Sequence, residues 1–230
     1  MRQFNLSSII ALTLLSGALV LWACSSGSTT SATKLVFHSK LIEGGEMAVP
    51  RDAAGGTLVG ISGLDKAGHL ANINPAEIKC TSSDETVVKA IPLGNACIVT
   101  GLVDRFDSPP GDAGVSDAGT NGSATDIYGA EPEAVITASI GKTKTELTVR
   151  VVVNAAGTWQ IEASGLTDEV VFEQVGRKLF VAGTNAPSGA IEDDLVTLLR
   201  DGLTFDGILG SRTTVSGTSG AIAWSAKKNP

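Results

Sequence analysis

Strict alternation of apolar and polar residues in short runs constrains this chain more than any other feature. Trp159, Ile161 and Ala163 take every second position of one run, and Trp224 and Ala226 do so in another. A period of two is typical of a strand with one buried face. The 27 glycines and the many Val and Thr residues in short runs also favour strands and turns over helices. An all-β protein is therefore predicted.

The C-terminal part of the chain, residues 154–230, is predicted to form a small antiparallel β-meander. Short strand-like runs recur there every eight to ten residues, with turns rich in Gly and Asp. Curling of the meander brings Trp159 and Trp224 into one interior, which gives a half-barrel or a small barrel. Residues 157–159 and 217–226 weakly resemble the lipocalin-like and avidin-like up-and-down barrels.

Residues 34–153 are predicted to form a second unit, because their short β-rich runs are spaced as in a β-sandwich. Their order carries a resemblance: "INPAEIKCTSSDETVVKA" (73–90), "NACIVTGL" (95–102) and "PEAVITASIGKTKTELTVRVVV" (132–153). These segments resemble the bacterial immunoglobulin-like domain, group 2. The resemblance implies an immunoglobulin-like sandwich for this part of the chain.

The two cysteines of this unit lie at positions that the resemblance makes informative. Cys80 stands where the family usually has a core tryptophan, and Cys97 lies in the following strand of a hairpin pair. If the two strands come together, Cys80 and Cys97 form a disulfide, as suits an exported protein. The alternative is two buried thiols. A zinc site is disfavoured, because no second cysteine or histidine pair accompanies them.

An insertion at residues 104–126 departs from the family pattern, which has only a turn there. It is rich in Asp, Gly and Ser and lacks long apolar runs, so we expect a disordered, solvated surface loop. A repeated Asp-Ala-Gly unit inside it suggests calcium as an alternative. The spacing matches neither an EF-hand nor a Gly-rich calcium repeat, and no metal site is predicted.

The N-terminus has the order of a secretory signal. Arg2 is the only charge before an apolar stretch from Leu6 to Trp22, and small residues follow. A signal peptide is predicted for residues 1–23. The apolar run is near the lower length limit for spanning a bilayer, so an uncleaved anchor is the less favoured alternative.

Cys24 is the predicted lipid attachment point. The stretch Leu21-Trp22-Ala23-Cys24 resembles a bacterial lipobox, from which only Trp22 departs. Lipidation also leaves the other two cysteines free to pair with each other. Residues 24–33 have the composition of a flexible tether. We expect a lipid-anchored protein of the outer membrane or cell surface; the alternative is plain secretion, with Cys24 trimmed or free.

No catalytic arrangement or cofactor motif is predicted. His38 and His69 are the only histidines, neither lies near a nucleophile motif, and both are interpreted as surface or edge residues. Asp193 and Asp194 are interpreted as ordinary hairpin-turn residues. A net charge of −7 argues against nucleic acid as a partner, because phosphate binding needs clustered Lys and Arg.

Three hypotheses for function follow. The first is a non-enzymatic cell-envelope lipoprotein, a display or binding module held to the membrane through Cys24 and facing a cell-surface protein or glycan. The second is a small-ligand carrier whose barrel pocket is lined by five aromatic residues, for which ordinary core packing is the alternative: Trp159, Phe172, Phe180, Phe205 and Trp224. The third is a carbohydrate-active enzyme or accessory module.

Overall fold

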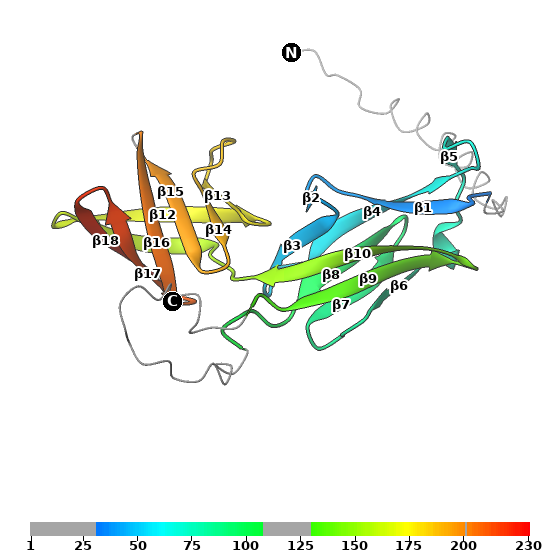
Figure 1. Cartoon of the computed structure of the whole chain (residues 1–230), viewed down its shortest axis with the longest axis horizontal. Coiled ribbons are helices and arrows are strands. Elements are labelled where there is room, and N and C mark those ends of the chain that lie inside the picture. The colour runs from blue at the N-terminus through cyan, green and yellow to red at the C-terminus, as the bar shows by residue number, and fades with distance from the viewer. Residues whose placement is uncertain (1–30, 108–129, 201) are drawn as a thin grey trace, which may run out of the picture.

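A computed structural model describes residues 31–107, 130–200 and 202–230. Within these ranges the chain is all-β, as predicted, and forms a two-sheet β-sandwich followed by a closed barrel (Figure 1). The predicted signal peptide 1–23 and Cys24 lie outside the described residues. So do most of the predicted tether and insertion.

The sandwich consists of two five-stranded sheets. In the first, the strand order is β1–β4–β8–β7, with β5 beside β4; in the second it is β2–β3–β10–β9–β6. All pairings are antiparallel except that of β3 with β10. The first sheet comprises β1 (Lys34–His38), β4 (Thr57–Leu64), β5 (Leu70–Ala71), β7 (Val88–Leu93) and β8 (Ala96–Gly101). The second comprises β2 (Ile42–Glu43), β3 (Glu46–Pro50), β6 (Lys79–Ser82), β9 (Glu133–Ile140) and β10 (Thr143–Val152), and the 3-10 turn η1 (Pro75–Glu77) precedes β6.

Alternation along each strand builds the sandwich core. In β9, every second residue from Ala134 to Ile140 is buried, and Val59 and Val99 face them from the other sheet with no exposed surface. Burial of branched aliphatic side chains between two sheets is the main source of stability in such a sandwich.

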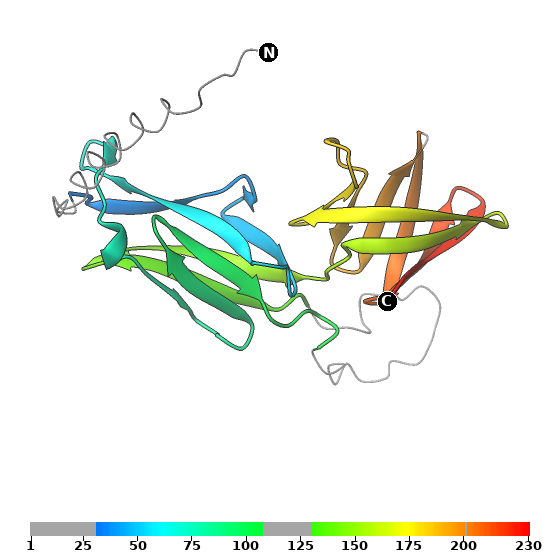
Figure 2. The same cartoon turned by 180° about the vertical axis from the view of Figure 1, so that it is seen from behind.

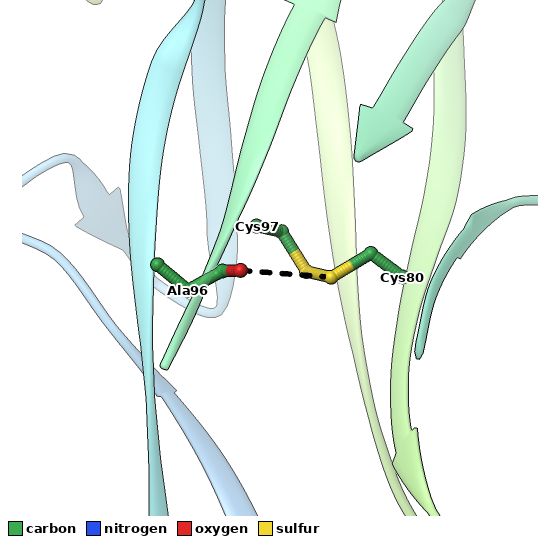
Figure 3. Close-up of a disulfide and its surroundings, with 3 residues drawn as sticks. All are labelled: Cys80, Ala96 and Cys97. Carbon is green, nitrogen blue, oxygen red and sulfur yellow. Dashed lines mark hydrogen bonds between the residues drawn. A yellow bond between two sulfur atoms is a disulfide. The ribbon is translucent and has the colours of Figure 1, made fainter. Parts of the chain in front are cut away.

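Cys80 and Cys97 form a disulfide that joins the two sheets (Figure 3). Cys80 belongs to β6 and Cys97 to β8, and both are buried in the core. The Cys80 sulfur lies 3.9 Å from the carbonyl oxygen of Ala96. This is a contact and not a hydrogen bond, because a disulfide sulfur carries no proton. The predicted pairing is thus present, and the two cysteines are not separate thiols.

The C-terminal unit is a closed up-and-down barrel of eight strands in sequence order. Its closure is made by β11 and β18, which pair from Trp159 with Lys228 to Ala163 with Trp224. A half-barrel is therefore excluded. The strands are β11 (Gly157–Ala163), β12 (Leu166–Val175), β13 (Lys178–Val181), β14 (Gly189–Glu192), β15 (Leu195–Arg200), β16 (Leu203–Ser211), β17 (Thr214–Ser219) and β18 (Ile222–Lys228).

Two tryptophans fill the barrel interior and have satisfied N–H groups. The Trp159 indole donates to the carbonyl oxygen of Ala155 at 2.8 Å, and the Trp224 indole donates to that of Asp206 at 3.0 Å. Gly207 makes room for the second ring, since a Cβ there would lie 2.6 Å from Trp224. Because both polar tips are paired, the rings can be buried at little desolvation cost.

Removing the disulfide by the double substitution Cys80→Ala, Cys97→Ala should lower the free energy of unfolding. The two cysteines are 17 residues apart, and freeing such a loop in the unfolded chain costs about 3 kcal/mol in the chain-entropy model. Urea titration measures the difference. Reductant should weaken the unsubstituted chain to the same extent and leave the double variant unchanged; an equal effect of reductant on both would contradict the prediction.

Candidate functional site

The end of the barrel that faces the sandwich (Figure 1) carries charged residues on three of its turns. Arg177 lies on the β12–β13 turn, Asp194 on the β14–β15 turn and Arg212 on the β16–β17 turn. Each faces an opposite charge from the sandwich. We call these three ion pairs the junction clamp: Arg177 with Glu131, Asp194 with Arg105, and Arg212 with Asp104.

Asp104 is the most deeply buried member of the junction clamp, with no exposed surface. Its carboxylate accepts hydrogen bonds from Nε and Nη2 of Arg212, both at 2.9 Å, and from the backbone N–H of Phe106 at 2.9 Å. These donors replace the water that the carboxylate loses, as a buried charge requires. In return, hydrogen bonding to Asp104 raises the pKa of Arg212.

Asp107 extends the same cluster toward solvent. Its carboxylate lies 2.6 Å from Nη2 of Arg212 and 3.1 Å from Nη1 of Arg51, and it accepts the backbone N–H of Asp104 at 2.9 Å. Partial burial by itself raises the pKa of Asp107, but the Asp104 N–H and the two guanidinium groups outweigh it, so the pKa is lowered. Asp107 is therefore ionised at neutral pH.

The second ion pair of the clamp lies at the barrel end itself. Arg105 and Asp194 are each about 2% exposed, and the Arg105 Nη1 atom is 3.9 Å from Asp194 Oδ1. The neighbouring Phe106 packs against the barrel core, and the Arg212 guanidinium lies 6.0 Å from the centre of its ring. One segment of the sandwich thus covers the end of the barrel with apolar and charged contacts together.

The third ion pair joins Arg177 to Glu131, whose residue is only 5% exposed. Both terminal nitrogens of Arg177 donate to the two carboxylate oxygens, one of them at 2.8 Å. A guanidinium and a carboxylate in this bidentate arrangement fix each other in orientation as well as in distance. Glu131 comes just before β9, so this contact also belongs to the sandwich.

The covalent linker between the two units is built into the barrel and does not hang free. Val153 and Ala155 are buried in the barrel core cluster. The Gln174 side chain donates to the carbonyl oxygen of Val153 at 3.0 Å and accepts the backbone N–H of Ala155 at 2.6 Å. The predicted boundary at residue 154 falls within this segment, which serves both units.

A cleft of about 270 Å³ opens beside the Arg177–Glu131 pair. We call it the junction cleft. Its barrel wall is the β12–β13 turn, and its sandwich wall comes from the region of β2, β3 and β10. The cleft is lined by the cationic side chains of Lys40, Arg150, Arg177 and Lys178 and by the carboxylates of Glu43 and Glu46. Its apolar residues include Leu41, Met47 and Val175.

The aromatic residues predicted as pocket lining mostly form packed core. Trp159, Phe172 and Trp224 are buried in the barrel cluster, and Phe205 packs against it with its ring edge-on to Trp224 at 6.0 Å. The space that they and their neighbours enclose is about 20 Å³, which holds about one water molecule. The core interpretation is therefore correct for these four.

Phe180 does not belong to the set. It alternates with the inward residues Leu179 and Val181, so it points to the outer side of β13, where it is only partly buried. A separate hollow of about 520 Å³, bordered by Glu162, Ser225 and Trp224, is wide open at the far end of the barrel. Within the described residues, no ligand-sized space lies inside the barrel.

Two predictions about charged residues were wrong. Asp194 is not an ordinary turn residue, because it is buried against Arg105, whereas its neighbour Asp193 is exposed. The segment 104–107, predicted as the start of a disordered insertion, is ordered by its contacts with the barrel. The remainder of that insertion, with the Asp-Ala-Gly repeat that suggested calcium, lies outside the described residues.

Both histidines lie on the surface, as expected. His38 ends β1 and its Nε2 atom is 3.3 Å from the Ser62 hydroxyl; His69 lies 3.7 Å from Asp65. No group of His, Cys, Asp and Glu with metal-binding geometry occurs in the described part of the chain. Among the same residues, no helix has the length and apolar character needed to cross a membrane.

Comparisons of the chain with family models, with curated proteins and with solved structures find no match. The structure itself shows the fold class, which is a β-sandwich joined to a closed eight-stranded barrel.

Substituting Asp104→Asn should destabilise the barrel and its attachment. The change removes the charge of a buried carboxylate and weakens the hydrogen bonds that it accepts from Arg212 and Phe106, which should cost about 1–3 kcal/mol. Asp52→Asn is the matched control, since Asp52 also pairs with an arginine, Arg51, but is 65% exposed; an exposed pair contributes about 0–1 kcal/mol. Urea unfolding followed by the fluorescence of Trp159 and Trp224 reports on the barrel. Equal decreases in the free energy of unfolding of the two variants would contradict a stabilising role for the junction clamp.

Stability should also depend on pH through Asp107. Because its pKa is lower in the folded chain than the ordinary value of 3.8, its contribution is present above that value and is lost as pH falls below it. Asp107→Asn should therefore be less stable than the unsubstituted chain at neutral pH, with a difference that shrinks below about pH 4. Chemical unfolding at a series of pH values tests this. A difference that is independent of pH would show that the Asp107 charge is not involved.

Proposed function

We propose that the protein is a non-enzymatic cell-envelope lipoprotein, anchored through Cys24, whose body displays the barrel away from the membrane. The observation that carries this proposal is where the chain enters the fold. The backbone N–H of Ser31 donates to Asn72 and that of Thr33 donates to Leu64, which ends β4. Both contacts lie at the pole of the sandwich opposite the barrel (Figure 2).

A short tether from Cys24 to Ser31 keeps that pole of the sandwich close to the membrane surface, because seven residues span at most about 25 Å. The barrel then lies at the outer end of the molecule. The lipobox resemblance, the disulfide and the all-β fold agree with an exported protein.

The junction clamp supports a role in display. Three ion pairs and the buried linker oppose rotation of the barrel against the sandwich. Buried ion pairs add little net stability compared with apolar packing, but each specifies one geometry, because any other arrangement leaves a charge unpaired. The packed barrel interior favours recognition through outer surfaces over carriage of a small molecule, and a cell-surface protein or glycan remains the proposed partner.

The proposal predicts both an anchor and an orientation. Cells fed an alkyne analogue of palmitate should label the unsubstituted chain but not Cys24→Ala, which should also leave the membrane fraction. In isolated membranes that carry an acceptor dye in the lipid, a donor dye on Ala67→Cys should transfer energy more efficiently than one on Ala221→Cys. Ala67 lies in the turn after β4, and Ala221 lies in the turn before β18 at the far end of the barrel; both are exposed.

The lipid anchor and the outward orientation of the barrel can each be rejected separately. Equal labelling of the unsubstituted chain and Cys24→Ala would reject the anchor. Equal transfer from the two donor positions, or greater transfer from Ala221→Cys, would reject the outward barrel. Urea unfolding of the two labelled variants provides the control that both are folded.

A further inference from the structure

The junction cleft gathers four cationic side chains in an acidic protein, whose net charge is −7. Glu43 and Glu46 also line it, and Glu131 and Glu133 pair with its arginines, so the two lysines are its more available cations. Lys40 is exposed and makes no ion pair with any other described residue. Among the described residues, Lys178 pairs only with the exposed Glu43, at 2.9 Å. Because an exposed pair contributes about 0–1 kcal/mol, a ligand can replace it at little cost.

The two arginines of the cleft are held in place before any ligand arrives. Arg177 is fixed by the buried Glu131, and Arg150 lies between Glu46 at 2.8 Å and Glu133 at 3.1 Å. Hydrogen bonding to Glu46 raises the pKa of Arg150. Each guanidinium carries five N–H donors, more than these pairs use. Donors already ordered by the protein lose less conformational entropy on binding.

Carboxylates in the same cleft narrow the chemistry of the ligand. A compact anion such as phosphate cannot keep its charge away from Glu43 and Glu46, whereas these carboxylates accept hydrogen bonds from the hydroxyl groups of a larger ligand. Leu41 and Val175 offer apolar surface beside them, suited to the C–H face of a sugar ring. The volume of about 270 Å³ is close to the lower end, about 300 Å³, of the range usual for small-molecule sites.

From this combination we infer that the junction cleft binds an acidic saccharide, a sugar-sized ligand that carries both a carboxylate and several hydroxyl groups. The ligand carboxylate pairs with Lys40 and Lys178, and its hydroxyl groups bind the two carboxylates and the arginines. Such a ligand touches both walls of the cleft, so it also stabilises the junction. This inference rests on the cleft alone and does not require the lipid anchor.

The test is calorimetric titration of the detergent-solubilised full chain with digalacturonate, with neutral digalactose and inorganic phosphate for comparison. Digalacturonate should bind, and the other two should bind at least about tenfold more weakly, which corresponds to one lost charge-assisted hydrogen bond. Lys40→Gln and Lys178→Gln should each weaken digalacturonate binding about tenfold. Digalacturonate should also raise the melting temperature of the unsubstituted chain.

Lys142→Gln is the matched control, because Lys142 is also exposed but lies in the β9–β10 turn, away from the barrel. It should bind digalacturonate as the unsubstituted chain does. The inference is overturned by absence of digalacturonate binding, by equally tight binding of digalactose or phosphate, or by an equal loss in Lys142→Gln. Any of these results leaves the anchor and the orientation untouched, since those are measured in membranes without a sugar.

Discussion

The Asp104 carboxylate, buried without exposed surface against Arg212, is the contact on which the arrangement of this molecule depends. A carboxylate in such a place is tolerated only while its hydrogen-bond donors are present. Those donors come from the barrel, 108 residues further along the chain, and from the backbone of its own segment. The sandwich and the barrel must therefore dock for Asp104 to be satisfied. Arg105 and Glu131 impose the same condition at two other turns of the barrel.

Strands with one buried face were predictable from the sequence, because a period of two follows directly from strand geometry. Trp159 and Trp224 lie inside the barrel for that reason, and their placement on the two closing strands agrees with the predicted curl. The same rule, applied to Leu179 and Val181, excludes Phe180 from the interior. Strand β3 was harder to foresee, since it is short, ends at Pro50 and pairs in parallel with a strand about a hundred residues later.

The junction could not be predicted from local pattern. Residues 104–107 read as the beginning of an Asp-, Gly- and Ser-rich loop, and Asp194 reads as a turn residue, because composition describes a segment in water and not against a partner. What buries them is contact with turns far away in sequence. One local signal was available: Arg105 and Phe106 between two aspartates are unusual in a stretch otherwise made of small residues. A large aromatic beside charges of both signs indicates a contact surface better than a solvated loop.

Because both side-chain contacts and the linker join the sandwich to the barrel, the evolution of the two units is coupled. The sandwich contributes Asp104 and Arg105 to the barrel end, and the linker contributes Val153 and Ala155 to the barrel core. A recombination breakpoint at residue 154 would divide all three ion pairs of the junction clamp between different parents. The two units are thus expected to have been inherited together, with substitutions at positions 104 and 212 occurring in concert.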